Sequence, residues 1–200
     1  MIACTVENKD PAALQDRQEV PWLVGHVVMA TSGLERQLSL LVVALAHAPL
    51  AEEIVRGQRG SDSINVARRV LRADQSRDEA ELPPFDSLPA RLPATLVQEI
   101  SEHLSQADTL LSRRDEVAHS LWMGVAVDAD REHIAVRIRR AGATENRWTP
   151  EALRGLYQGI VNTTVDLYTD TVNTRSARTG MTLWPSRGNG DIAPLPDWSA

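Results

Sequence analysis

A run of apolar residues at helical spacing dominates the first quarter of the sequence. Between Leu23 and Leu45, apolar side chains recur every three or four residues, which places them on one face of an α-helix. The stripe consists of Leu23, Val27, Ala30, Leu34, Leu38, Leu41 and Leu45. Pro21 is predicted to open this helix near Trp22, and Pro49 to end it after Ala48. Because such a stripe must be buried against something, we expect a fold of packed helices.

Similar patterns predict the rest of the fold. A short helix is expected over 11–19, a helix over about 61–72 and a loop over 74–93, which carries four prolines. A second long helix is expected from near Pro93 to Leu121, with an apolar stripe of its own.

From Leu121 the pattern changes to alternation, which predicts a β-hairpin near 121–140. Thr149-Pro150-Glu151 is typical of a helix start, and that helix is expected to end near Arg175. The predicted fold class is therefore mainly α: an up-and-down helical bundle of about four to five helices with a β-hairpin insertion.

Composition favours one soluble domain with an aliphatic core. Apolar residues make up 42% of the chain and charged residues 24%, but aromatic residues only 4%. We expect an N-terminal segment at 1–19, a helical domain at 20–176 and a Gly- and Pro-rich flexible tail at 177–200. The apolar segment 38–48 is too short to span a bilayer, and the first residues do not resemble a secretory signal, so we expect a cytoplasmic protein with no membrane partner.

The titratable residues do not form a metal-binding pattern. Cys4 is the only cysteine, which excludes an internal disulfide and a cysteine zinc cluster. His26, His47, His103 and His133 are scattered without a metal-ligand spacing, and each is expected to be a surface or helix-end residue. The net charge of −6 argues against unspecific coating of nucleic acid.

The segment 110–122 carries the chemistry. Arg114 falls on the apolar stripe of its predicted helix, where a charge requires an explanation, and Asp115 and His119 follow it. Asp115 and His119 are four residues apart and share a helix face, so the carboxylate could orient the imidazole. Arg114 and His119 are five apart, about 140° around a regular helix. Either the helix bends here, or a second protomer completes the site.

These residues resemble the motif of the HEPN superfamily (the higher eukaryote and prokaryote nucleotide-binding domains). Its signature is an arginine, a polar residue, three further residues and a histidine, and Arg114, Asp115 and His119 match it position by position. Val117-Ala118 before the histidine and Ser120-Leu121-Trp122 after it also look like bacterial members. The resemblance covers about residues 20–175.

The resemblance implies an RNA-cutting protein that needs no metal and no cofactor, in a toxin–antitoxin or phage-defence setting. Arg114 and His119 would be the catalytic pair, with Asp115 beside them. Attack of the RNA 2′-hydroxyl on the adjacent phosphate would leave a 2′,3′-cyclic phosphate and a 5′-hydroxyl. As in the family's dimers, two copies would pair their motifs, so we expect a homodimer, with RNA as substrate and an antitoxin or another protein as a further partner.

Other interpretations of the same residues remain open. Arg114 could form an interhelical salt bridge with Glu35 or Asp108, and Asp115 could simply satisfy a half-buried His119. The chain would then be a non-catalytic dimeric interaction module, acting as an adaptor, a neutraliser or a sensor.

Several further arginines are candidates for RNA contacts. Arg68, Arg69 and Arg72 belong to a locally basic stretch, and Arg113 adjoins the motif. A solvated helix face would explain these charges equally well. Trp122 and Trp148 could stack a base or fill the core.

Overall fold

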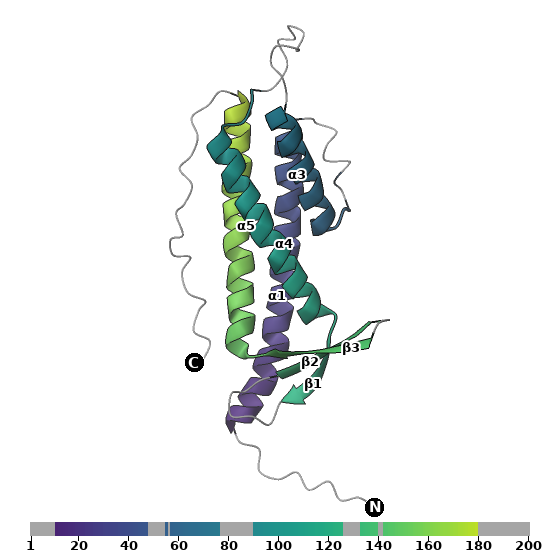
Figure 1. The fold of residues 1–200 in the computed structure, drawn as a ribbon. Helices are drawn as coiled ribbons and strands as arrows, with labels where there is room; N and C mark the ends of the chain where they lie inside the picture. The colour runs from purple at the N-terminus through teal and green to yellow at the C-terminus, as the bar shows by residue number, and fades with distance from the viewer. Residues whose placement is uncertain are drawn as a thin grey trace, which may run out of the picture. The chain divides into compact units, whose positions relative to one another are not determined.

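The computed structural model describes residues 11–47, 55, 57–76, 90–125, 133–139 and 142–179. This part of the chain is mainly helical with a small inserted sheet, which confirms the predicted fold class (Figure 1). Its elements are α1 (Pro11–Ala46), α3 (Gly60–Ser76), α4 (Ala94–Ala118), β1 (Leu121–Val125), β2 (His133–Arg139), β3 (Gly142–Trp148) and α5 (Pro150–Thr179). Residues 1–10, most of the predicted 74–93 loop and the tail from 180 lie outside the described residues.

The chain forms two compact units. We call Met1–Ser32 with Leu110–Ile160 the first unit, and Gly33–Thr109 with Val161–Ala200 the second unit. Three long helices contribute to both units: α1 divides after Ser32, α4 after Thr109 and α5 after Ile160.

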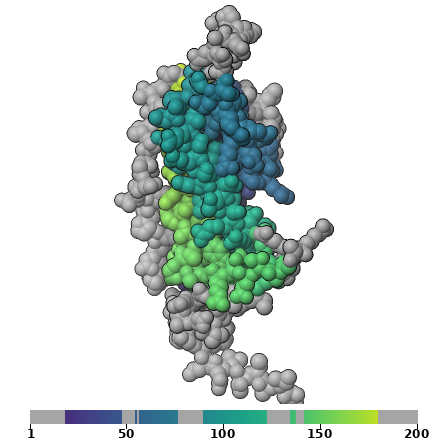
Figure 2. Space-filling model, viewed as in Figure 1, coloured from purple at the N-terminus to yellow at the C-terminus, as the bar shows by residue number. Residues whose placement is uncertain are grey.

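The second unit has an aliphatic core. The second half of α1 buries one leucine at each turn, and α3 and α4 bury the apolar faces that they turn inward. The buried residues are Leu34, Leu38, Leu41 and Leu45 from α1, Ile64, Ala67 and Leu71 from α3, and Leu96, Ile100 and Leu104 from α4. Each large side chain contributes roughly 1.5–3 kcal/mol by leaving water. Figure 2 shows α3 and this segment of α4 side by side on one face, joined by an ion pair between Arg68 and Asp108.

The start of α1 differs from the prediction. One helix runs from Pro11 to Ala46 with Pro21 inside it, so the expected break between 11–19 and Trp22 is wrong. Proline removes one helical hydrogen bond and crowds the carbonyl four residues earlier, which normally ends or kinks a helix. Here Val20 and Leu23 on either side of the proline are 4% and 1% exposed, so packing holds the helix together across it.

The sheet of the first unit is antiparallel in the order β1-β2-β3. Leu121 pairs with Val136 between β1 and β2, which confirms the predicted hairpin strands. The third strand was not predicted: β3 pairs with β2 from His133 opposite Trp148 to Arg139 opposite Gly142. Gly142 has φ +130°, a conformation that favours glycine at this turn.

Arg178 fixes the end of α5 in the second unit. The helix continues past the predicted end near Arg175 to Thr179. Arg178 donates to Asp74 Oδ1 over 2.7 Å and to the Leu45 carbonyl over 3.2 Å, while Asp74 Oδ2 accepts from the Leu92 amide over 3.0 Å. Both charged side chains are almost fully buried. One ion pair therefore ties together the ends of α1, α3 and α5 and the segment that leads into α4.

Among the described residues, one helical segment, Glu19–Ala46, is long and apolar enough to cross a membrane. Buried core helices meet the same criterion, and much of this segment's apolar surface is covered within the fold. In the same part of the chain, no three His, Cys, Asp or Glu side chains gather closely enough to hold a metal ion.

Candidate functional site

The motif residues occupy the last turn of α4 in the first unit. The His119 amide donates to the Asp115 carbonyl over 3.2 Å, so helical bonding continues one residue beyond Ala118. The Trp122 indole donates to the Val117 carbonyl over 3.1 Å, which ties the start of β1 back onto the helix end. Trp122 thus has a structural role at the helix–strand junction, and the backbone that carries the motif is anchored on both sides.

Arg114 and His119 converge on one carboxylate oxygen. Arg114 Nη1 donates to Asp115 Oδ1 over 3.0 Å, and His119 Nε2 lies 4.0 Å from the same oxygen. The two nitrogens cannot be further apart than the sum of these distances. A single protomer therefore brings both groups to the same carboxylate, because the arginine side chain is long and Asp115 is four residues before the histidine.

The three side chains differ in exposure. Arg114 is 21% exposed, Asp115 48% and His119 61%, so the imidazole is open to a ligand while the guanidinium is partly enclosed. Arg114 Nε is buried and has no hydrogen-bond partner in the described part of the chain. A buried, unsatisfied N–H from a cation is a strong donor toward an anion that approaches it.

One of the two alternative partners suggested for Arg114, Asp108, is engaged elsewhere. Asp108 pairs with Arg68 over 3.1 Å, and the ion pair that Arg114 does form is with its neighbour Asp115. The charge of Arg114 is thus partly neutralised within the motif itself.

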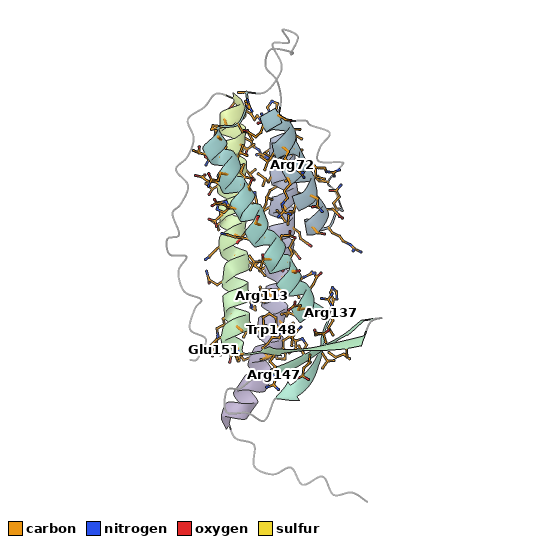
Figure 3. The ribbon with its side chains drawn as sticks, viewed as in Figure 1. Arg72, Arg113, Arg137, Arg147, Trp148 and Glu151 are labelled. Carbon is orange, nitrogen blue, oxygen red and sulfur yellow. The ribbon has the colours of Figure 1, made fainter. Side chains whose placement is uncertain are left out.

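Arg113 lies against an aromatic ring of the same unit. Its guanidinium carbon is 5.3 Å from the centre of the Trp148 ring, a cation–π distance (Figure 3). Trp148 is only 5% exposed, so this ring fills the core and offers no open surface for a base. Arg113 itself is exposed, and its role in RNA binding remains a prediction.

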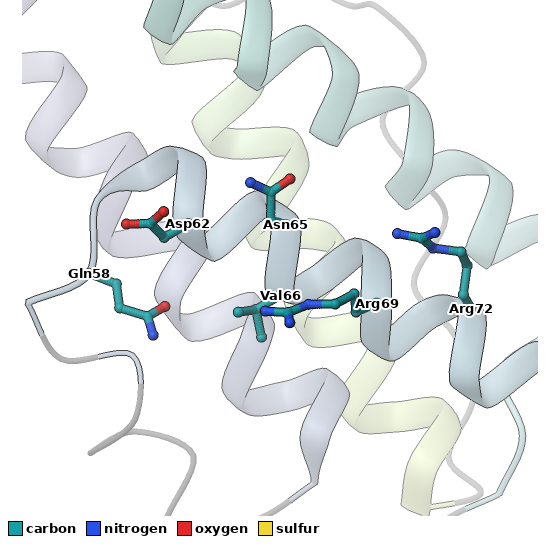
Figure 4. Close-up of a pocket in the computed structure, with 6 residues that line it drawn as sticks. All are labelled: Gln58, Asp62, Asn65, Val66, Arg69 and Arg72. Atoms are coloured by element: carbon teal, nitrogen blue, oxygen red, sulfur yellow. The ribbon is translucent and has the colours of Figure 1, made fainter.

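The other predicted RNA-binding arginines belong to α3 in the second unit. Arg68 is held by Asp108, while the Arg72 Nε donates to the Arg68 carbonyl over 3.2 Å. Arg69 and Arg72 are exposed and line a groove, which is also lined by Gln58, Asp62, Asn65 and Val66 (Figure 4).

Sequence reasoning missed a second histidine–carboxylate contact, in the second unit. His103 Nδ1 lies 2.8 Å from Asp170 Oδ2, and the carboxylate is 2% exposed. The hydrogen bond to Asp170 raises the pKa of His103 above 6.5, and burial raises the pKa of Asp170 and of Asp166. His103 is therefore an interhelical residue between α4 and α5 and not the surface residue expected. The i, i+4 spacings of Glu99 to His103 and of Asp166 to Asp170 were the available signal.

No family model, curated protein or solved structure matches this chain. The candidate site therefore rests on its own residues and geometry.

Proposed function

We propose that this chain is a metal-independent endoribonuclease of HEPN type, with Arg114 and His119 as its catalytic residues. The observation that carries the proposal is the convergence of a guanidinium and an exposed imidazole on Asp115 Oδ1. Imidazole suits proton transfer near neutral pH, and arginine suits the negative charge that grows on a phosphate under attack.

The reaction follows from these two groups. His119 takes the proton of an RNA 2′-hydroxyl, and the 2′-oxygen forms a bond to the adjacent phosphorus. The phosphorus–O5′ bond breaks, the leaving 5′-oxygen takes a proton from solvent, and a 2′,3′-cyclic phosphate remains. Arg114 donates to the non-bridging phosphate oxygens, and Asp115, which faces Nε2, keeps the ring turned so that Nδ1 can accept the proton.

We place this reaction in a cytoplasmic homodimer. Leu121 follows His119 by two residues and is 59% exposed, and Trp22 and Met29 of the same unit are 41% and 64% exposed. Large exposed apolar side chains in the unit that carries the motif favour contact with another protein surface. A second copy would cover them and bring a second motif to the interface, and an antitoxin is the alternative partner. The toxin or phage-defence setting rests on the HEPN resemblance alone.

The test is RNA cleavage in EDTA by wild type, Arg114→Gln and His119→Asn. General-base catalysis is worth about 10²–10⁴ in rate, so His119→Asn is expected to lose at least about a hundredfold. His47→Asn is the matched control, because His47 is exposed with φ 47° and asparagine tolerates that conformation. Equal cleavage by wild type and His119→Asn, or none by wild type across a broad RNA pool, would remove the proposal. Light scattering tests the dimer separately, and a cleaving monomer would refute that part.

One observation favours a second candidate, a non-catalytic dimeric interaction module. The ion pair with Asp115 already neutralises Arg114, as expected where the motif only stabilises a helix end or a protein surface. This candidate predicts that Arg114→Gln and His119→Asn weaken self-association or partner binding, with no RNA cleavage by any variant.

A further inference from the structure

A polar groove runs along α3 in the second unit (Figure 4). It encloses about 560 Å³ and opens to solvent. Its lining residues are Gln58, Asp62, Asn65, Val66, Arg69 and Arg72. Those on the helix recur every three or four residues, so they share one face, which extends over roughly 15 Å of helix.

The chemistry of the groove changes along its length. At its start, Gln58 Oε1 is buried and accepts no hydrogen bond in the described part of the chain, and the Asp62 carboxylate follows in the first turn of α3. Hydrogen-bond acceptors therefore dominate this end. An acceptor that is buried and unpaired is destabilising until a donor reaches it, which favours a ligand with a hydroxyl or amino group here.

The other end of the groove is cationic. Arg69 forms no ion pair within the described residues, and its side chain lies back along the helix toward Val66 (Figure 4). Arg72 is held by its Nε bond to the Arg68 carbonyl, which leaves its terminal nitrogens for a ligand. Two guanidinium groups that follow one another on a helix face suit a phosphate, since each presents several donors in a fixed fork.

We infer that this groove binds a nucleotide, with its phosphate at Arg69 and Arg72 and a ribose hydroxyl or base amino group at Gln58 and Asp62. The nucleotide is either a unit of an RNA chain, which rests on the proposed function, or a free nucleotide. An acidic peptide fits less well, because its carboxylates would meet Asp62 and the unpaired Gln58 oxygen.

The test uses the full chain carrying His119→Asn, so that RNA stays intact, in EDTA. Binding of a fluorescent single-stranded RNA octamer is measured beside AMP, inorganic phosphate and an acidic peptide. Arg69→Gln with Arg72→Gln is expected to weaken nucleotide binding about tenfold and to lower its salt dependence. Arg36→Gln with Arg175→Gln is the matched control, since both arginines are exposed in the same unit and the same charge is removed.

The outcomes separate the sources and the alternatives. If the groove variant binds both AMP and RNA more weakly, the groove is a site for a free nucleotide. If it binds RNA alone more weakly, the groove holds one unit of an RNA chain. Gln58→Met should reduce AMP or RNA binding while leaving inorganic phosphate unchanged. Equal weakening by the groove and control variants, or equal binding of the acidic peptide, would overturn the inference. Cleavage by the chain with native His119 is scored separately, so loss of one proposal leaves the other measurable.

Discussion

Two histidine–carboxylate contacts occur in this chain, and they differ in nearly every physical respect. In the first unit, His119 and Asp115 lie one helical turn apart, 4.0 Å from each other and largely exposed. In the second unit, His103 and Asp170 come from different helices, and His103 Nδ1 lies 2.8 Å from Asp170 Oδ2. The Asp170 carboxylate is almost fully buried. The looser contact leaves an imidazole that is open to solvent. The tighter one commits its histidine to holding α4 against α5.

The comparison teaches that a short, buried contact is weak evidence for chemistry. The pKa of His103 is raised by its hydrogen bond to Asp170, and by that criterion alone His103 would be a strong candidate for catalysis. Its Nδ1 is occupied, however, and the acids around it, Glu99, Asp166 and Asp170, would repel a phosphate. His119 has an arginine beside its carboxylate, which is the charge that a phosphate substrate needs.

The largest expected effect that separates the two contacts is on folding stability. Asp170→Ala removes a buried partner and is expected to lower the free energy of unfolding by about 1–3 kcal/mol. Asp115→Ala at an exposed helix end is expected to change it by less than about 0.5 kcal/mol. Urea denaturation measures both changes, provided that the dependence of the unfolding free energy on urea concentration stays the same. The effect of Asp170→Asn, which still accepts a hydrogen bond, should fall between the two. An Asp115→Ala effect as large as that of Asp170→Ala would break the distinction.

The next effect is on the pH dependence of stability. The pKa of His103 is raised by its hydrogen bond to Asp170, so its stabilising contribution is fully present below 6.5 and is lost as pH rises through the folded value. The carboxyls of Asp166 and Asp170 have pKa values raised by burial, so their contribution is present below 3.8 and is also lost as pH rises. Stability therefore falls as pH rises, with the carboxyl contributions lost from 3.8 upward and the His103 contribution from 6.5 upward.

Thermal unfolding of wild type and His103→Gln from pH 5 to pH 9 measures this effect. In the variant, most of the decline in stability around and above pH 6.5 should be lost. A wild-type stability that rises across this range would contradict the assignment.

The smallest expected effect is on salt sensitivity. Exposed ion pairs are screened, with a Debye length near 10 Å at 0.1 M salt and about 3 Å at 1 M. The small stability difference between wild type and Asp115→Ala should therefore vanish at 1 M NaCl, while the difference for Asp170→Ala should persist. Unfolding by urea, which adds no charge, measures the two differences at both salt concentrations. An Asp115→Ala effect that does not change with salt would show that this contact is more enclosed than its exposure indicates.

A helix boundary could be predicted from the sequence where neighbouring residues alone determine it. Thr149 caps α5 through a bond from the Ala152 amide to its hydroxyl, as the Thr-Pro-Glu sequence indicated. Pro21 misled the prediction, because the packing that carries α1 through it is not visible locally. The strand β3 was missed because its sequence, GATENRW, is mostly exposed and becomes a strand only by pairing with β2.

The candidate site was predictable for the same reason. Arg114, Asp115 and His119 lie within one helical turn or two, so their spacing already limits their geometry, although the shared oxygen on Asp115 was not foreseen. The sequence showed the arginines of the α3 groove and the i, i+4 spacings around His103, but neither the groove itself nor the partner of His103. Their character depends on which polar atoms stay unpaired and which distant residues meet, as for His103 and Asp170, which are 67 positions apart.

The Arg178 ion pair has a consequence for how the chain acquires its structure during synthesis. Asp74 is made 104 residues before the guanidinium that neutralises it, and the Leu45 carbonyl 133 residues before. Contacts so distant in sequence slow folding, because a long loop must close before they form. A ribosome-bound chain that lacks α5 would leave the Asp74 carboxylate hydrated and the ends of α1 and α3 untied. The second unit is thus expected to mature late, after its last helix has emerged, rather than progressively from the amino end.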